Sequence, residues 1–137
     1  MKITVETNVN SDIDTAWKAW SDPEAIKKWN AASDDWHTTD ARSDLREGGT
    51  FFSRMEARDG SIGFDFEGTY TRVEPKTLIE YNIADGREVT VEFQETDIGV
   101  RVREVFETES TNPPEVQREG WQAILDNFAR YVNTLGK

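Results

Sequence analysis

The N-terminal residues alternate between polar and apolar side chains. Ile3, Val5 and Val9 fall on one side of this alternation, together with Thr7. A period of two residues is typical of a β-strand that buries one of its faces. We therefore expect the chain to open with a strand.

Two helix starts follow this strand. Ser11-Asp12-Ile13-Asp14 has the pattern of a capping box. The apolar residues that then recur at helical spacing are Ile13, Ala16, Trp17 and Trp20. Asp22-Pro23 combines a capping side chain with a proline that fits the first helical turn. The sequence predicts a helix after Ser11 and a short second helix over about Glu24 to Trp29.

The region from Trp36 to Phe106 consists of short alternating runs separated by turn signals. The signals are Glu47-Gly48-Gly49, Asp59-Gly60, Glu74-Pro75, Asp85-Gly86 and Asp97-Ile98-Gly99. Within each run one parity is apolar and the other is mostly charged. This pattern is typical of an antiparallel sheet with one buried face, so we predict a meander of about six antiparallel strands.

The last segment has the period of a long helix. Asn112-Pro113-Pro114-Glu115 combines a capping Asn, prolines suited to a first turn, and a Glu at the third helical position. Apolar residues follow at helical spacing, namely Trp121, Ile124, Leu125, Phe128, Val132 and Leu135. At 1.5 Å per residue this helix is roughly 34 Å long, enough to cross the sheet. With no repeat and no linker, residues 1–137 are expected to form one α+β domain.

Charge and composition exclude several classes of partner. The chain carries 16 Lys and Arg against 27 Asp and Glu, a net charge of −11. This charge disfavours nucleic acid and anionic membrane surfaces. There is no Cys and a single His, so neither a disulfide nor a multi-histidine zinc site is expected. The N-terminus lacks the apolar run of a secretion signal, and we expect a cytoplasmic protein.

Six segments in order resemble the activator of heat-shock protein 90 ATPase homologue family. They are Ala16 to Trp20, Asp22-Pro23-Glu24, Glu47-Gly48-Gly49, Asp59-Gly60, Phe66 to Tyr70, and Gly120 to Leu125. This family belongs to the START-like (SRPBCC) superfamily, which includes the birch-pollen-allergen fold and polyketide cyclases. The resemblance implies a helix-grip fold: a curved seven-stranded antiparallel sheet around the C-terminal helix, with two short helices after the first strand.

A sheet of this curvature can leave a cavity between itself and the helix. We expect the cavity lining among the inward residues Trp29, Trp36, Phe51, Met55, Phe64, Phe66, Tyr81, Phe93, Trp121, Leu125 and Phe128. The alternative is that these aromatics pack the core completely. Gly120 and Gly68 have two interpretations, close packing between helix and sheet or a portal, and close packing is favoured at both.

Three polar residues are candidates for chemistry. Glu104 shares its parity with Val102 and Phe106, so it should face inward with a raised pKa, unless a bulge near Arg103 to Val105 turns it outward or an Arg pairs with it. His37 could join Glu104 and Tyr81 in a polar cluster that orients a ligand or abstracts a proton, although a lone His is more often simply exposed.

No cofactor or metal is expected. Asp34-Asp35 lacks the spacing of a calcium loop, and the sequence contains no phosphate loop, dinucleotide fingerprint or nucleophile elbow.

Three functions remain open. The first is a carrier or sensor of a small hydrophobic molecule, lipid-like or aromatic and polyketide-like. The second is a cyclase- or hydrolase-type enzyme with Glu104 or His37 as general base and Tyr81 as donor. The third is a co-chaperone-like, stress-linked module that contacts a chaperone through the outer sheet face. A monomer or weak dimer is expected in each case.

Overall fold

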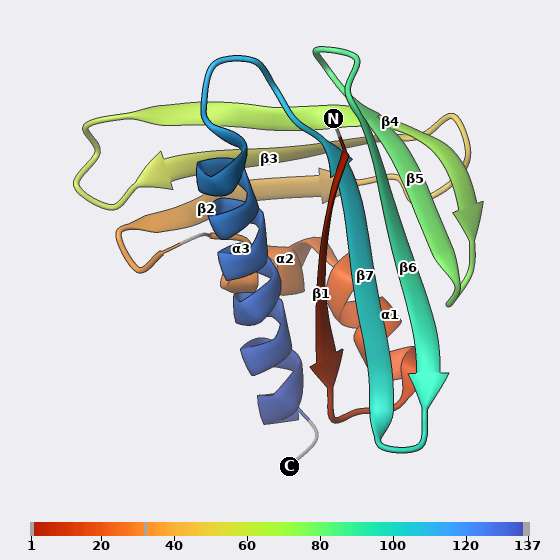
Figure 1. Cartoon of the computed structure of the whole chain (residues 1–137). Helices are drawn as coiled ribbons and strands as arrows, with labels where there is room; N and C mark the ends of the chain where they lie inside the picture. Colours follow the sequence, from red (N-terminus) through yellow and green to blue (C-terminus); the bar gives the residue numbers. More distant parts are fainter. Residues whose placement is uncertain (1, 32, 136–137) are drawn as a thin grey trace.

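The computed structural model describes residues 2–31 and 33–135 and has an α+β architecture (Figure 1). In chain order the elements are β1 (Lys2–Val9), α1 (Ile13–Ser21), α2 (Pro23–Trp29), β2 (Trp36–Ser43), β3 (Thr50–Ala57), β4 (Gly63–Glu74), β5 (Leu78–Ile83), β6 (Glu88–Thr96), β7 (Gly99–Glu107) and α3 (Pro114–Leu135). This order confirms the predicted helix-grip fold.

All seven strands form one antiparallel sheet in the order β1-β7-β6-β5-β4-β3-β2. The long strand β4 shifts its register against β5 between Tyr70 and Arg72. Such irregularities bend a strand and increase its twist. Figure 1 shows β2, β3 and β4 running across the direction of β1, β7 and β6. The sheet is therefore curled, and its concave face looks toward α3.

The caps of the first two helices come from aspartates. The Asp12 carboxylate accepts a hydrogen bond from the Thr15 amide at 2.7 Å, so the cap of α1 is Asp12 and not the predicted box that begins at Ser11. The Asp22 carboxylate accepts from the Glu24 amide at 3.1 Å, with Pro23 in the first turn of α2, as expected. The two helices follow each other directly and cover one end of the sheet (Figure 1).

Helix α3 begins at Pro114, close to the prediction, but the loop before it is held by Gln117 and not by a capping Asn112. The Gln117 side-chain amide donates to the Glu109 carbonyl at 3.1 Å and to the Asn112 carbonyl at 2.7 Å. Its oxygen accepts from the Glu109 amide at 2.9 Å. One buried side chain therefore satisfies three backbone groups of the β7–α3 loop.

Helix α3 lies against β1, α1 and α2. Gln122 donates to the carbonyl of Glu6 at 3.1 Å, and the Asn10 amide donates to the side chain of Asn133 at 2.9 Å. Both bonds tie the helix to the β1 edge of the sheet. The side of α3 that carries Trp121 and Ile124 is left facing the concave surface further along the sheet.

One aromatic group, here called the packed cluster, fills the space between α1, α2, β6 and α3. Its members are Trp17, Trp20, Trp29, Phe93 and Phe128. Phe128 is fully buried, with ring centroids 4.9 Å from Trp20 and 5.0 Å from Trp29. The Trp29 indole N–H donates to the Ala19 carbonyl at 2.9 Å, so this polar group is satisfied inside the core.

Candidate binding cavity

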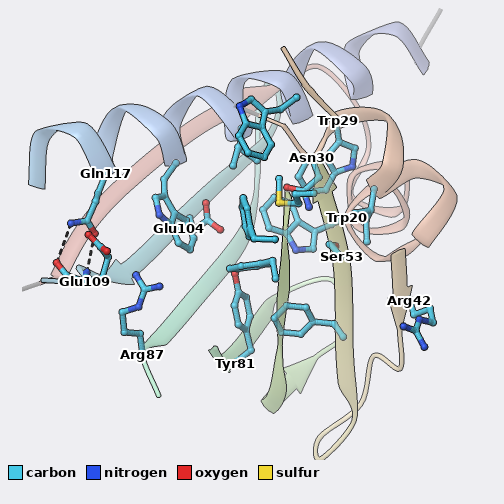
Figure 2. Close-up of a pocket in the computed structure, with 18 of the residues that line it drawn as sticks. Trp20, Trp29, Asn30, Arg42, Ser53, Tyr81, Arg87, Glu104, Glu109 and Gln117 are labelled. Carbon is cyan, nitrogen blue, oxygen red and sulfur yellow. Dashed lines mark hydrogen bonds between the residues drawn. The ribbon is translucent and has the colours of Figure 1, made fainter. Parts of the chain in front are cut away.

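A cavity of about 680 Å³ lies between the concave face of the sheet and α3 (Figure 2). Its lining comes from α1, α2, strands β2 to β5, β7, α3 and the adjoining loops. The predicted residues that line it are Trp29, Trp36, Phe51, Met55, Phe64, Phe66, Tyr81, Glu104 and Trp121. Phe64 is 47% exposed, so the cavity reaches the surface on the side of β4. These aromatic residues therefore do not fill the interior completely.

The aromatic wall, here called the cavity cluster, consists of Phe51, Phe66, Tyr70, Tyr81 and Trp121. Phe51 lies at its centre, with ring centroids 5.7 Å from Phe66, 5.3 Å from Tyr70 and 4.8 Å from Tyr81. Trp121 approaches Phe66 at 6.4 Å from the side of α3. Trp121 is itself held in place, because it stacks on the buried Phe106 with ring centroids 4.3 Å apart and an interplanar angle of 7°.

The packing around Gly68 and Gly120 differs from the close helix–sheet approach that the sequence favoured. At Gly68 a Cβ would lie 2.8 Å from the ring of Phe51 and 2.1 Å from the Asn82 carbonyl oxygen, so the close approach is by the neighbouring strands and not by the helix. Phe51 is paired with Gly68 across β3 and β4 and covers it. At Gly120 a Cβ would meet nothing within 4 Å, so the expected tight helix packing is wrong there.

Glu104 lies in β7 with its side chain on the concave face. The pairing of β7 with β1 and with β6 continues without a register shift through residues 103–105, so the bulge considered as an alternative is absent. Glu104 is 5% exposed, and burial raises the pKa of its carboxyl group from 4.5 to about 8. No described residue donates a hydrogen bond or forms an ion pair with this group, so the arginine pairing is absent as well. The carboxyl oxygens are open to the cavity (Figure 2).

Tyr81 lies in β5 and faces the same space (Figure 2). Burial raises the pKa of its hydroxyl well above 10, and the nearby Glu104 charge adds to this rise. The hydroxyl therefore stays protonated at any physiological pH. At neutral pH the Glu104 carboxyl also keeps its proton, so the cavity contains two uncharged groups that can both donate and accept hydrogen bonds.

His37 does not join these two residues. It lies in β2 opposite Glu56 and borders a separate surface groove of about 340 Å³. Trp29 and Trp36 line both this groove and the cavity, so they form part of the wall between the two spaces. The predicted cluster of three polar residues is reduced to the pair Glu104 and Tyr81.

Three further predicted lining residues lie in the packed core instead. Phe93 is buried and packs against Trp17 and Trp20. Leu125 and Phe128 are fully buried on α3. Inward parity selected them correctly as core residues, but it could not separate the filled end of the interior from the open end.

The structure adds lining residues that the sequence analysis did not select. They are Trp20, Ile26, Asn30, Arg42, Ser53, Tyr70, Arg87, Glu109, Asn112, Gln117 and Ile124. Ser53 shares its parity with Phe51 and Met55, so the strand pattern could have identified it. Arg87, Glu109 and Asn112 lie at turns and loops, where no periodicity shows the direction of a side chain.

Charged residues at the cavity margin are paired. The Arg87 guanidinium donates to Asp85 at 2.8 Å and to the Glu107 carbonyl at 3.5 Å. Glu109 accepts a hydrogen bond from the Asn112 amide at 2.6 Å. Glu104 thus differs from the charged residues of the rim, because it has no partner among the described residues.

Residues 2–31 and 33–135 contain no group of three or more His, Asp or Glu side chains placed to hold a metal ion. Within the same ranges, none of the helices combines the length and apolar character that crossing a bilayer requires.

Comparison with known proteins agrees with this architecture. Residues 10–133 match the family described as Activator of Hsp90 ATPase homolog 1-like protein. The AHSA1-like protein from Aeromonas hydrophila is 51% identical, with a TM-score of 0.94 over 99% of this chain and 94% of that one. Chr148 from Cytophaga hutchinsonii is 47% identical, with a TM-score of 0.84 over 98% and 93% of the two chains.

A more distant structure shows the fold alone. Protein NE0264 from Nitrosomonas europaea is 19% identical, with a TM-score of 0.84 over 98% of this chain and 96% of that one. No curated protein matches the sequence. The match to residues 10–133 covers most of the chain, and it agrees with the six motifs that first suggested the resemblance. The chain therefore belongs to the Activator of Hsp90 ATPase homolog 1-like family, with a START-like helix-grip fold.

Proposed function

We propose that this protein binds a small, largely apolar molecule in the cavity between the sheet and α3, as a carrier or sensor. The observation that carries the proposal is the contrast between a cavity of about 680 Å³ and an otherwise close-packed core. Natural interiors rarely leave such a space unfilled, and ligand sites are typically cavities of this size with mostly apolar walls.

The aromatic lining supplies the affinity in this proposal. A ligand that buries about 200 Å² of apolar surface gains roughly 5 kcal/mol at 25 cal/mol per Å², before the costs of association are subtracted. Because Phe51 and Trp121 are held by ring contacts with their neighbours, little side-chain entropy is lost when a ligand packs against them. Glu104 and Tyr81 supply hydrogen bonds that orient the molecule.

A thermal-shift screen against lipids, flavonoid-like aromatics and polyketide-like compounds tests the proposal. We expect a hit to raise the melting temperature and to change the Trp fluorescence, because Trp121 lines the cavity. Ser53→Leu adds bulk at a buried lining position of β3. We expect this variant to need at least tenfold more ligand to reach the same rise in melting temperature.

Thr4→Leu is the matched control, since Thr4 lies on the exposed face of β1. This variant should respond to the ligand as the parent does. If the whole library is silent, or if Ser53→Leu binds its ligand unchanged, the cavity is not the binding site.

One observation favours a second candidate, a cyclase- or hydrolase-type enzyme. Glu104 has a pKa of about 8 and faces an open space beside Tyr81. Since the carboxyl holds its proton at neutral pH, it would act first as a general acid and not as the expected general base. Turnover that disappears in Glu104→Gln, while a neutral ligand still binds, would support this candidate. Equal turnover in the two proteins would reject it.

A further inference from the structure

Glu104 is the innermost ionisable side chain of the cavity lining, and its surroundings supply no counter-ion. Its neighbours across the sheet are Val5 in β1 and Val91 in β6, both buried and apolar. No described residue pairs with the carboxyl group. Buried charged groups in proteins are normally paired or hydrogen-bonded, so a lone carboxyl facing a cavity calls for a partner from outside the chain.

The other charged groups that face the cavity already have partners. Arg87, on the β5–β6 turn, is bonded to Asp85. Arg42, in β2, lies 3.8 Å from Asp40 and stacks 4.5 Å above the ring of Phe52. Glu109, in the β7–α3 loop, accepts a hydrogen bond from the Asn112 amide at 2.6 Å. From α3 the lining side chains are neutral, namely Gln117, Trp121 and Ile124. Among the described residues, the cationic groups of the lining, Arg42 and Arg87, thus have partners, and the carboxyl group of Glu104 has none.

The cavity cluster suits a cation. The rings of Phe51, Phe66, Tyr81 and Trp121 line the same space as Glu104. Aromatic faces attract ammonium groups through the ring quadrupole, and this attraction is larger where water is excluded. The net charge of −11 also raises the local concentration of cations near the protein.

We propose that the ligand of this cavity is an organic cation, a protonated amine attached to an apolar body, whose ammonium group pairs with the Glu104 carboxylate. This inference rests on the proposed function and names its ligand class. The apolar body lies against the cavity cluster. The ammonium group donates charge-assisted hydrogen bonds to Glu104, which are roughly twice as strong as neutral ones.

The proposal has a consequence for protons. Glu104 is protonated in the empty cavity at neutral pH, and pairing with an ammonium group requires the carboxylate. Binding therefore releases up to one proton per ligand below pH 8. The apparent affinity for an amine should rise roughly tenfold between pH 6 and pH 7 and level off above pH 8, because one pH unit changes the carboxylate fraction tenfold.

Three ligands of equal chain length test the inference: decylamine, decan-1-ol and decanoate, each below its micelle concentration. We expect isothermal titration calorimetry at pH 7 to show decylamine binding at least tenfold more tightly than the alcohol and the carboxylate. Repeating the titration in buffers of different ionisation enthalpy counts the protons, and we expect close to one released for decylamine and none for decan-1-ol.

Glu104→Gln keeps the shape of the side chain and removes its charge. This variant should lose at least tenfold in decylamine affinity at pH 8.5, lose the proton release, and bind decan-1-ol within about twofold of the parent. Glu92→Gln, on the exposed outer face of β6, makes the same charge change and should leave all three affinities unchanged. Comparing the decan-1-ol affinities of the two variants separates a loss of charge from a loss of fold.

The outcomes distinguish this inference from the proposed function. If decan-1-ol or decanoate binds as tightly as decylamine, or if Glu104→Gln leaves decylamine binding intact, the cationic ligand is rejected while the cavity remains a binding site. If none of the three ligands binds to the folded protein, the cationic ligand is rejected, and the proposed function is then decided by the thermal-shift screen alone.

Discussion

The packed cluster and the cavity cluster contain the same kinds of residue in opposite states. In the packed cluster, Trp20, Trp29 and Phe128 lie with ring centroids about 5 Å apart, and Phe128 is fully buried. In the cavity cluster, Phe51 and Tyr81 lie just as close, with ring centroids 4.8 Å apart, yet these rings border a cavity of about 680 Å³. Aromatic composition therefore does not decide whether an interior is filled.

The difference between the two clusters arises from the two short helices, α1 and α2. At the packed end, α1 and α2 insert their side chains between the sheet and α3, which lies against both helices. Further along the sheet, the curl of β2 to β4 turns these strands away from α3 (Figure 1). The cavity occupies the part of the concave face beyond α1 and α2, and Trp20, Ile26 and Trp29 of these helices form its wall at that end.

The largest expected effect comes from removing one ring at each end. Phe128→Ala deletes a fully buried ring of the packed cluster and should lower the free energy of unfolding by about 3–5 kcal/mol. Phe66→Ala deletes a partly exposed ring beside existing space and should cost less than about 1.5 kcal/mol. Urea denaturation of both variants measures the contrast. Equal losses would mean that both ends are packed alike.

The second effect concerns Glu104 and pH. An unfolded chain releases this proton near pH 4.5, whereas the folded protein keeps it until about pH 8. The stability associated with the neutral carboxyl is therefore complete below pH 4.5 and is lost as the pH rises to 8. The loss is on the order of 5 kcal/mol, from 1.36 kcal/mol per pKa unit.

Glu104→Gln should lack this loss. The free energy of unfolding of the variant should therefore increase relative to that of the parent between pH 5 and pH 9. Chemical denaturation at several pH values, with Glu92→Gln as the control for an exposed carboxylate, measures the difference. Parallel pH profiles for the parent and Glu104→Gln would place the carboxyl in contact with solvent.

A smaller effect is expected at the cavity rim. Gln117→Ala removes three hydrogen bonds to the backbone of Glu109 and Asn112. We expect a loss of about 1–3 kcal/mol and faster amide hydrogen exchange in the β7–α3 loop, since buried backbone groups would lose their partners. Gln122→Ala is a suitable comparison, because Gln122 also donates to a backbone carbonyl but its hydrogen bond is exposed to solvent. Unchanged exchange in the loop would show that water replaces Gln117.

The smallest effect distinguishes the two glycines. Gly120→Ala places a methyl group in open space inside α3 and should stabilise the protein by about 0.5–1 kcal/mol. Gly68→Ala should destabilise it, because the methyl group would meet the Asn82 carbonyl and the Phe51 ring. Thermal unfolding of both variants tests this pair. Destabilisation by Gly120→Ala would indicate that α3 packs more closely than described.

Much of the fold was predictable because its signals are local. Alternation in β1, the Asp22-Pro23 start of α2, and the turn signals between strands each depend on a few neighbouring residues. Where two local signals compete, geometry chooses between them: Asp12 caps α1 in preference to Ser11. The start of α3 was predicted correctly to within two residues, but its partner Gln117 acts across a loop that no pattern shows.

The candidate site divides in the same way. Parity correctly placed Glu104 and Tyr81 on the inner face, because side-chain direction in a strand is set by position alone. Parity was ambiguous for His37, at the start of β2, and the structure places that residue at another groove. Lining residues from turns, such as Arg87, are invisible to any periodicity.

By itself, the sequence determined the elements, their order, the inner face of each strand and the family. Only the tertiary structure decided which inner residues touch each other and which border a cavity, for example that Phe128 is packed while Phe66 lines open space. The physical reason is that burial direction is a property of one strand or helix. An empty volume depends on the distances between several elements. Those distances are set by the curl of the sheet and by the position of α3 against it.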